Sequence, residues 1–517
     1  MDGRSHSKAK FALVAIPVLV LAGQSLVDIL GTGEWHIAGQ NLNNTWNQRA
    51  GREIGTGNIQ SLQVKWTFST AGDVSATPTV AGNVVYVPDW GGNLFALRAD
   101  NGELIWAHSI AEYDGVSGSV SRVSPAVSGD EVIIGDILNS KTTHNGANVI
   151  AVDRGTGALR WITQVDKHPA AIITGSPVVF NNTVYVGVSS NEEGLATDNS
   201  YPCCTFRGSM VALNATTGAM LWKTFVVPDN GGKTGGYSGG AIWQPPAVDI
   251  RRGLLYVGTG NNYEVPSTVE ACQNSNPQGT CTAPDDYFDT ALALDLKNGA
   301  IRWAKRLQGF DVWTVACTSK PPGVNCPSPS SPDYDLPGSG PNLLPNMVGF
   351  GQKSGIYWAL NPDNGSILWS AIVGPGSTLG GMEWGTATDG ARIYAAIGNA
   401  EHKEYTLQPS GTTINWGSWS AIDVTNGHIV WQTADPTQGA MDESSLSVSN
   451  GIVYAGSYAG GMYAMDATTG RILWSFASGG SVIDAPSIVN GTLFWGSGYR
   501  KIAPGIGNNK VYAFAIP

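Results

Sequence analysis

The stretch "MYAMDATTGRILW", residues 462–474, places alternating apolar residues on both sides of a Thr-Gly turn and ends in tryptophan. This pattern predicts two antiparallel strands joined by a tight turn, because glycine adopts the positive φ that such turns require. Related stretches end at Trp106, Trp161, Trp222, Trp303, Trp369 and Trp431. Copies spaced by roughly 40 to 80 residues are typical of four-stranded propeller blades that carry insertions.

The two ends of the repeat region supply one further blade. Residues 62–70, "LQVKWTFST", have no opening strand before them, and residues 511–517, "VYAFAIP", have no closing strand after them. Pairing these ends closes the ring and removes sheet edges that favour aggregation. We therefore expect an all-β, eight-bladed β-propeller of four-stranded antiparallel blades, closed by pairing of the N- and C-terminal strands. It forms a single domain over residues 33–517.

Composition and the first residues define the class of protein. The chain has 517 residues with 67 Gly, 18 Trp and only 13% charged residues, a mix typical of turn-rich β proteins. A net charge of −11 argues against a nucleic-acid partner. Residues 1–24 have a basic start, a short apolar run and small residues at the end, which predicts an export signal or, alternatively, an uncleaved anchor. No second candidate span follows, so we expect an exported protein, secreted or periplasmic.

Two of the six cysteines, Cys203 and Cys204, are neighbours in the chain. They could bridge elsewhere, stay free, or bond to each other in a strained ring, because neighbouring Cα atoms lie about 3.8 Å apart whereas most disulfides prefer roughly 4.4–6.8 Å. An even cysteine count in an exported chain indicates disulfides, and local pairing of the other four favours the vicinal bond. The favoured pairs are Cys203–Cys204, Cys272–Cys281 and Cys317–Cys326.

The longest insertions between strands are residues 189–208, 260–289 and 310–341. They follow comparable strand ends, so we expect them near one mouth of the central channel. Together with the repeats, "WHIAGQNLNNTWNQ" (35–48) and "TGNIQSLQVKW" (56–66) resemble the pyrroloquinoline-quinone (PQQ) dependent alcohol dehydrogenases. The similarity is greatest to the polyvinyl-alcohol dehydrogenase type and its plant relatives, and it covers roughly residues 33 to 517. Non-enzymatic propellers such as outer-membrane assembly lipoproteins share the repeat.

This resemblance implies a calcium ion and PQQ in the channel. In the family, a Glu, an Asn and an Asp hold the calcium ion through hard oxygen ligands. The matching motifs are "GVSSNEEGL" (187–195) for Glu192 or alternatively Glu193, "LYVGTGNNY" (255–263) for Asn261, and "PDDYFDTALALD" (284–295) for Asp285 or alternatively Asp286 or Asp289.

The resemblance also implies contacts to the cofactor. Trp243 of "GGAIWQPPAVD" (239–249) would stack under the quinone, a flat aromatic side chain beneath a flat ring system. A cationic side chain beside the quinone oxygens would stabilise negative charge on reduction. The remaining contacts are Arg122 to the carboxylates, Thr174 and Ser189 as hydrogen-bonding groups, Lys353 beside the quinone oxygens, and Trp384.

Three features depart from the family pattern. Family members often carry a ring of adjacent cysteines over PQQ, and Cys203–Cys204 would supply it at the channel mouth, although this pair follows Glu192 instead of preceding the arginine. Ser75 stands where a glutamate is expected, and Glu383 stands where an asparagine is expected. A carboxylate at position 383 would repel the three carboxylates of PQQ unless it is protonated or shielded.

The implied activity is oxidation of a secondary, polymeric or long-chain alcohol to a ketone or aldehyde. Asp285 would act as general base, Ca²⁺ would polarise a quinone carbonyl, and hydride would pass to that carbon. Because the chain has no Cys-x-x-Cys-His stretch for a covalent haem, electrons would pass to an external acceptor such as cytochrome c. The alternatives are a non-catalytic scaffold that has lost PQQ binding, or an enzyme of different chemistry such as metal-assisted hydrolysis.

Overall fold

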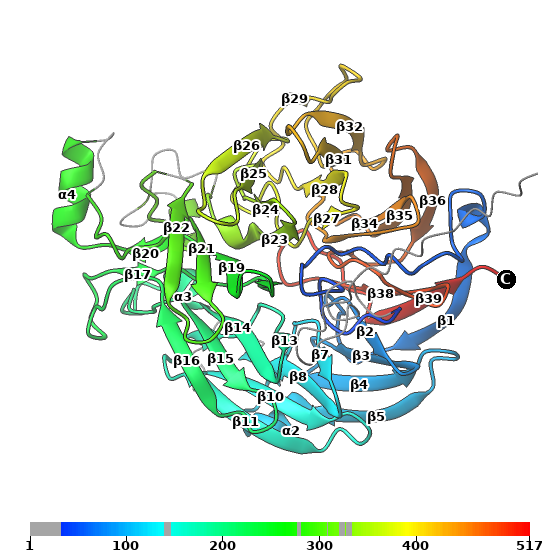
Figure 1. The fold of residues 1–517 in the computed structure, drawn as a ribbon, viewed down its shortest axis with the longest axis horizontal. Helices are drawn as coiled ribbons and strands as arrows, with labels where there is room; N and C mark the ends of the chain where they lie inside the picture. Colours follow the sequence, from blue (N-terminus) through cyan, green and yellow to red (C-terminus); the bar gives the residue numbers. More distant parts are fainter. Residues whose placement is uncertain (1–32, 139–145, 277–280, 308, 320–325, 327–332) are drawn as a thin grey trace, which may run out of the picture.

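The computed structural model describes residues 33–138, 146–276, 281–307, 309–319, 326 and 333–517. Eight antiparallel sheets stand around a common centre, with four strands each along their main path (Figure 1). The predicted eight-bladed propeller is thereby confirmed. The expected export signal at residues 1–24 lies outside the described part of the chain. Within that part, no helix is both long and apolar enough to cross a membrane.

In seven blades the four strands follow one another along the chain from the centre of the ring to its rim, and in the eighth blade β1 supplies the rim strand (Figure 1). The innermost strands are β2 (Thr79–Ala81), β7 (Ala126–Ser128), β13 (Val178–Phe180), β18 (Ala247–Asp249), β23 (Ser339–Leu344), β27 (Ala387–Thr388), β33 (Leu446–Ser449) and β37 (Ser487–Val489). The second strands are β3 (Val84–Pro88), β8 (Glu131–Gly135), β14 (Thr183–Ser190), β19 (Leu254–Gly258), β24 (Met347–Gly351), β28 (Arg392–Ile397), β34 (Ile452–Gly456) and β38 (Thr492–Ser497). The third strands are β4 (Asn93–Arg98), β10 (Ala147–Asp153), β15 (Ser209–Asn214), β21 (Thr290–Asp295), β25 (Ile356–Leu360), β31 (Ser418–Asp423), β35 (Gly461–Asp466) and β39 (Lys510–Ala515). The rim strands are β5 (Leu104–Ser109), β11 (Leu159–Asp166), β16 (Met220–Phe225), β22 (Ile301–Arg306), β26 (Ile367–Ile372), β32 (Ile429–Ala434), β36 (Ile472–Ala477) and β1 (Gln63–Ser69).

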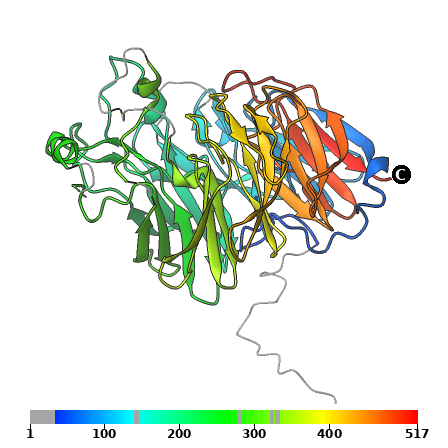
Figure 2. The same cartoon turned by 90° about the horizontal axis from the view of Figure 1, so that it is seen from above.

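The remaining elements belong to insertions and turns. Short strands pair as β6 (Ser119–Val120) with β9 (Ile137–Leu138), β17 (Ser238–Gly239) with β20 (Asn262–Glu264), and β29 (Tyr405–Thr406) with β30 (Thr413–Ile414), while β12 (Ala171–Ile172) pairs with β14. The described helices are α2 (Ile110–Asp114), α3 (Glu192–Leu195), α4 (Ser267–Ser275) and the 3₁₀ turns η1 (Ile59–Ser61), η2 (Val315–Thr318) and η3 (Leu336–Gly338). In both views α4 projects from the edge of the ring, so this part of insertion 260–289 does not cover the channel mouth (Figures 1 and 2).

Strand β1 closes the ring by pairing with β39, as the two chain ends predicted. Their register runs from Gln63 opposite Ala515 to Ser69 opposite Lys510. Figure 1 shows this junction where the blue and red ends of the chain meet in one sheet. The sheet therefore combines segments more than 400 residues apart, and β1 completes the eighth blade as its rim strand.

A repeated indole contact joins neighbouring blades. The tryptophan of each rim strand donates its Nε1–H to a backbone carbonyl in the turn region of the next blade, at 2.7–3.2 Å. The turn glycine lies directly beneath the indole, as at Gly299 under Trp222. The donors and acceptors are Trp66 to Ala99, Trp106 to Arg154, Trp161 to Ala215, Trp222 to Leu296, Trp303 to Pro362, Trp369 to Val424, Trp431 to Ala467 and Trp474 to Leu62.

This contact makes a glycine-to-alanine change informative. Gly299 has φ +70°, and a Cβ there would lie 2.5 Å from Cε3 of Trp222. Gly253 has φ +68°, but a Cβ there would meet no heavy atom within 4 Å. We expect Gly253→Ala to cost about 1–2 kcal/mol from backbone strain alone. Gly299→Ala should cost about 1–3 kcal/mol more because it also displaces the indole. Urea denaturation of both variants measures this difference, and equal losses would contradict the packing role.

Candidate functional site

One position in the blade supplies most of the side chains that face the centre of the ring. It lies three or four residues before the innermost strand. These segments carry no regular hydrogen-bonded structure, so their side chains are free to point into the channel while the following strand holds the backbone. The residues at this position that line the central cavities are Ser75, Arg122, Thr174, Trp243, Asp335, Trp384, Glu443 and Ile483.

The larger central cavity has a volume of about 370 Å³, within the roughly 300–1,000 Å³ typical of small-molecule sites. Its wall mixes aromatic, cationic and acidic groups. The indoles of Trp243 and Trp384 meet edge to face with ring centres 5.5 Å apart, and the Arg122 guanidinium lies 4.1 Å from the Trp384 ring centre. The predicted cofactor contacts that line this cavity are Arg122, Thr174, Ser189, Trp243, Lys353 and Trp384.

The two adjacent glutamates of α3 point in different directions. Glu193 is half-buried and lines the cavity. Glu192 is fully buried away from it, where its carboxylate accepts hydrogen bonds from the backbone N–H groups of Thr205 at 2.9 Å and Phe206 at 2.7 Å. The structure thus corrects the placement expected for Glu192: its oxygens are used to hold the loop at residues 203–206, and Glu193 faces the candidate metal position.

Asp335 lines the same cavity, and the buried Asn261 lies directly beside Asp335 without lining the cavity itself. The Asp335 carboxylate accepts a hydrogen bond from the backbone N–H of Asn261 at 2.8 Å and another from the Lys353 ammonium at 3.0 Å. The Asn261 amide nitrogen donates to the carbonyls of Asn262 and Trp313, at 2.7 and 2.6 Å, which leaves the amide oxygen on the opposite side. Asp335 lines the cavity directly. It precedes β23 within the 310–341 insertion, and the sequence motifs did not single it out.

Asp285 is not part of this arrangement. Its side chain is exposed and does not line either central cavity. The alternatives at Asp286 and Asp289 are buried, but neither lines these cavities. Asp335, four residues before β23, is an acid that does line the large cavity.

Burial of Asp286 predicts a pH-dependent stability. Burial raises the pKa of Asp286 to about 7, although a hydrogen bond from Asn262 opposes this shift. The unfolded chain loses this proton near pH ~4, so between ~4 and 7 only the folded state holds it. Stability therefore falls as pH rises through this window, by up to about 1.4 kcal/mol per pH unit. Asp286→Asn removes this loss, so the variant should gain stability relative to wild type from pH 5 to pH 8. Urea denaturation of both proteins at pH 5 and pH 8 measures this gain. An equal stability difference between variant and wild type at the two pH values would contradict the prediction.

The six cysteines form the three disulfides that the sequence favoured, Cys203–Cys204, Cys272–Cys281 and Cys317–Cys326. The vicinal pair lines neither central cavity. Cys204 is buried in the core, and its backbone N–H donates to Glu264 at 3.1 Å. The structure therefore places the disulfide in the loop that Glu192 holds, and not over the candidate cofactor position.

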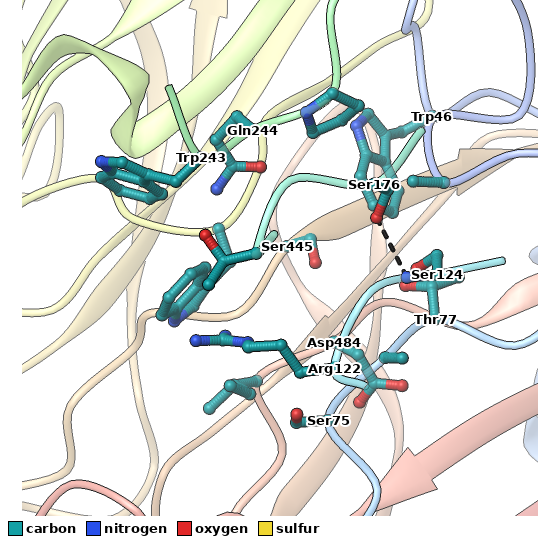
Figure 3. Close-up of a pocket in the computed structure, with 16 residues that line it drawn as sticks. Trp46, Ser75, Thr77, Arg122, Ser124, Ser176, Trp243, Gln244, Ser445 and Asp484 are labelled. Carbon is teal, nitrogen blue, oxygen red and sulfur yellow. Dashed lines mark hydrogen bonds between the residues drawn. The ribbon is translucent and has the colours of Figure 1, made fainter. Parts of the chain in front are cut away.

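A smaller cavity of about 40 Å³ shares Trp243 with the large cavity (Figure 3). Its wall includes several serine and threonine hydroxyl groups. The Ser124 backbone N–H donates to the Ser176 hydroxyl at 3.0 Å across it, marked by the dashed line in Figure 3. Ser75 accepts a hydrogen bond from the Trp90 indole at 2.8 Å. The departure at Ser75 therefore creates a hydrogen-bonding partner for Trp90 and leaves no unpaired charge.

Glu383, the second departure, lines the large cavity beside Lys353, with 3.9 Å between Oε1 and the ammonium. Burial raises the pKa of Glu383 well above its usual value, although Lys353 opposes the shift. Burial opposes the charge of Lys353, yet the carboxylates of Asp333, Glu383 and Asp335 hold its pKa well above the usual value. Burial thus favours the neutral acid at Glu383, and the neighbouring carboxylates favour the charged ammonium at Lys353, so both shifts reduce the repulsion of an anionic ligand.

The cavity fits the implied cofactor and cation. Two indoles offer flat faces, Arg122 and Lys353 offer positive charge for carboxylates, and Glu193 and Asp335 offer carboxylate oxygens. The amide of Asn261 lies directly beside Asp335. Such oxygen donors suit Ca²⁺. Within the described residues no three His, Cys, Asp or Glu side chains gather closely enough to hold a metal by themselves. A calcium site here therefore depends on the amide of Asn261 and on cofactor or water oxygens beside the two carboxylates.

The chain resembles known proteins over nearly its whole length. Residues 57–305 and 415–515 match the profile of a PQQ-type repeat family described as outer membrane protein assembly factor BamB. A polyvinylalcohol dehydrogenase from Sphingopyxis sp. (strain 113P3) is 31% identical, over 92% of this chain and 74% of the relative. A quinohemoprotein alcohol dehydrogenase from Comamonas testosteroni superimposes with TM-score 0.67 at 19% identity, over 94% of this chain and 81% of that one. BamB from Moraxella catarrhalis gives TM-score 0.53 at 14% identity, over 88% and 99%.

The fold defines a PQQ-type eight-bladed propeller with a cavity in its channel. Within that class, the chain belongs to the quinoprotein alcohol dehydrogenase family, beside the polyvinylalcohol dehydrogenases. The structural neighbours under 25% identity support the fold alone.

Proposed function

We propose that this protein oxidises an alcohol to a ketone or aldehyde, with PQQ and Ca²⁺ bound in the large central cavity. The observation that carries the proposal is the gathering of an aromatic floor, two cations and four acidic side chains in one cavity of suitable size. Trp243 would lie against the cofactor ring, and Arg122 and Lys353 would pair with its oxygens. Thr174 and Ser189 would donate further hydrogen bonds.

Asp335 is the proposed general base, in place of Asp285. Hydrogen bonds from Asn261 and Lys353 fix the orientation of its carboxylate at the cavity wall. It would take the proton of a substrate hydroxyl placed between Asp335 and the cofactor, and it would share the calcium ion with Glu193 and Asn261. When bound, PQQ would accept the hydride that the alcohol carbon gives up, with Ca²⁺ as Lewis acid.

The substrate is proposed to be a secondary, long-chain or polymeric alcohol, as the name of the polyvinylalcohol dehydrogenase relatives suggests. Apolar residues beside the acidic cluster would contact the alkyl part of such a substrate, because the cavity wall includes Ile172, Leu195, Trp313, Val315 and Leu379. Electrons would leave to an external acceptor such as a cytochrome c. We further propose export by residues 1–24, which agrees with three disulfides, since such bonds persist in oxidising compartments.

The test is reconstitution of the purified protein with PQQ and Ca²⁺, followed by dye reduction with primary, secondary and polymeric alcohols. We expect turnover that requires both PQQ and Ca²⁺ and is fastest with secondary or polymeric alcohols. Absence of turnover together with absence of PQQ binding would favour the second candidate, a non-catalytic scaffold. The observation that supports the scaffold hypothesis is the match to the family described as outer membrane protein assembly factor BamB.

A further inference from the structure

A surface cleft lies next to the cofactor cavity and shares a wall with it. The cleft has a volume of about 220 Å³ and is lined by Ala71, Gly72, Asp73, Trp90, Gly91, Arg500, Lys501 and Asn509. The loop after β38 forms the wall, because Arg500 and Lys501 line the cleft whereas the next residue, Ile502, lines the cavity. This loop therefore separates the cavity from the cleft.

Aromatic side chains lie at this wall. Trp90 lines the cleft, and its ring centre lies 6.1 Å from that of Tyr499. The Arg122 guanidinium, which lines the cavity, lies 4.1 Å from the Trp384 ring centre, 5.5 Å from Tyr499 and 5.8 Å from Trp90. Tyr499 is buried, and the Trp90 indole is fixed by its hydrogen bond to Ser75. The Arg122 guanidinium thus connects the Trp384 ring at the cavity with the Tyr499 and Trp90 rings that lead to the cleft.

The mouth of the cleft carries positive charge on a protein whose net charge is −11. Lys501 is exposed, with its ammonium 4.6 Å from the Trp90 ring centre. Arg500 bonds to Asp73, yet 61% of its side chain remains exposed. Positive charge beside an aromatic ring attracts and orients an acidic surface of a partner protein.

We propose that this cleft is the electron exit, where a one-electron carrier protein with an acidic face docks over Trp90 and Lys501. The inference rests on the proposed function. Each alcohol oxidised to a carbonyl gives up two electrons and two protons. Two carrier molecules, docking in turn, each take one electron through Trp384, Tyr499 and Trp90, and the two protons pass to solvent. Neither Trp90 nor Lys501 lines the catalytic cavity.

The experiment compares wild type with Lys501→Glu, Trp90→Leu and the control Lys297→Glu, an equal charge change at an exposed turn of another blade. Protein loaded with PQQ and Ca²⁺ is first reduced by alcohol without an acceptor and followed by absorbance, which tests the proposed function alone. It is then mixed with an acidic or a basic cytochrome c at low and high salt. Calorimetry also measures the affinity of the unloaded variants for the acidic cytochrome.

All four proteins should be reduced by alcohol at the same rate. Lys501→Glu should weaken binding of the acidic cytochrome and slow electron transfer to it about tenfold at low salt, an effect lost at 0.5 M salt, whereas Lys297→Glu should do neither. Trp90→Leu should slow electron transfer while leaving binding unchanged. Equal re-oxidation rates and affinities in Lys501→Glu and Lys297→Glu would overturn the proposal. Failure of alcohol to reduce the wild type would instead refute the proposed function.

Discussion

Replacing Asp335 by asparagine is expected to lower the rate of alcohol oxidation by about 10²–10⁴-fold, the usual contribution of a general base. The amide has the size of the carboxylate but cannot accept the hydroxyl proton. Asp335 lines the cavity and is held by Asn261 and Lys353, so the substitution should leave the shape of the site in place. The measurement is kcat of the reconstituted variant, with PQQ affinity determined in parallel.

Asp285→Asn is the matched control, because the same chemical change is made on the exposed acid that the sequence motif favoured. It should retain full activity. Loss of activity in Asp285→Asn with full activity in Asp335→Asn would restore the assignment based on sequence and refute the one based on geometry. Asp285→Asn should unfold at the wild-type temperature, whereas Asp335→Asn should lose about 1–3 kcal/mol because one amide oxygen cannot accept from both Asn261 and Lys353. Retained PQQ affinity in the folded variant separates a catalytic loss from a folding defect.

Replacing Glu193 by glutamine should weaken calcium binding at least about 100-fold, because the site has few carboxylates and loses one of them. Burial raises the pKa of Glu193 to about 8, although Lys353 opposes the shift. The wild type should therefore release up to one proton at pH 7 when calcium binds, and the variant should release none. Calorimetry in buffers of different ionisation enthalpy measures both quantities.

Glu192→Gln makes the same change one residue earlier, with a different expected outcome. Glu192 accepts hydrogen bonds from Thr205, Phe206 and Tyr201, so the variant should lose about 1–3 kcal/mol of stability. Its calcium affinity should stay within about threefold of wild type. A large loss of calcium affinity in Glu192→Gln and none in Glu193→Gln would reverse the roles assigned to the two residues.

The propeller was predictable because each blade repeats the same physical solution. A turn glycine, a rim tryptophan and two alternating strands recur at seven places, and the half-copies at the two ends complete the eighth blade. In the structure the indole of one blade rests on the turn glycine of the next, so the repeat encodes both the blade and its packing against its neighbour.

The site was most predictable where it follows the repeat. Arg122, Thr174, Trp243 and Trp384 share the position just before an innermost strand, and all four line the cavity. Asp335 holds an equivalent place, but the long 310–341 insertion separates it from the repeat that would have revealed it. The choice between adjacent glutamates depends on which way a short helix turns, and the distance from Cys203–Cys204 to the cavity depends on loop path. Neither is encoded in motif spacing.

The central claim is that the large cavity binds PQQ together with calcium. The most direct test is calorimetric titration of the calcium-loaded protein with PQQ, beside Asn261→Ala. Asn261 would hold the calcium ion without touching the indole floor, so its loss should weaken PQQ binding through the cation. We predict one-to-one binding that Asn261→Ala and removal of calcium both weaken. No binding of PQQ by the calcium-loaded wild type would contradict the account.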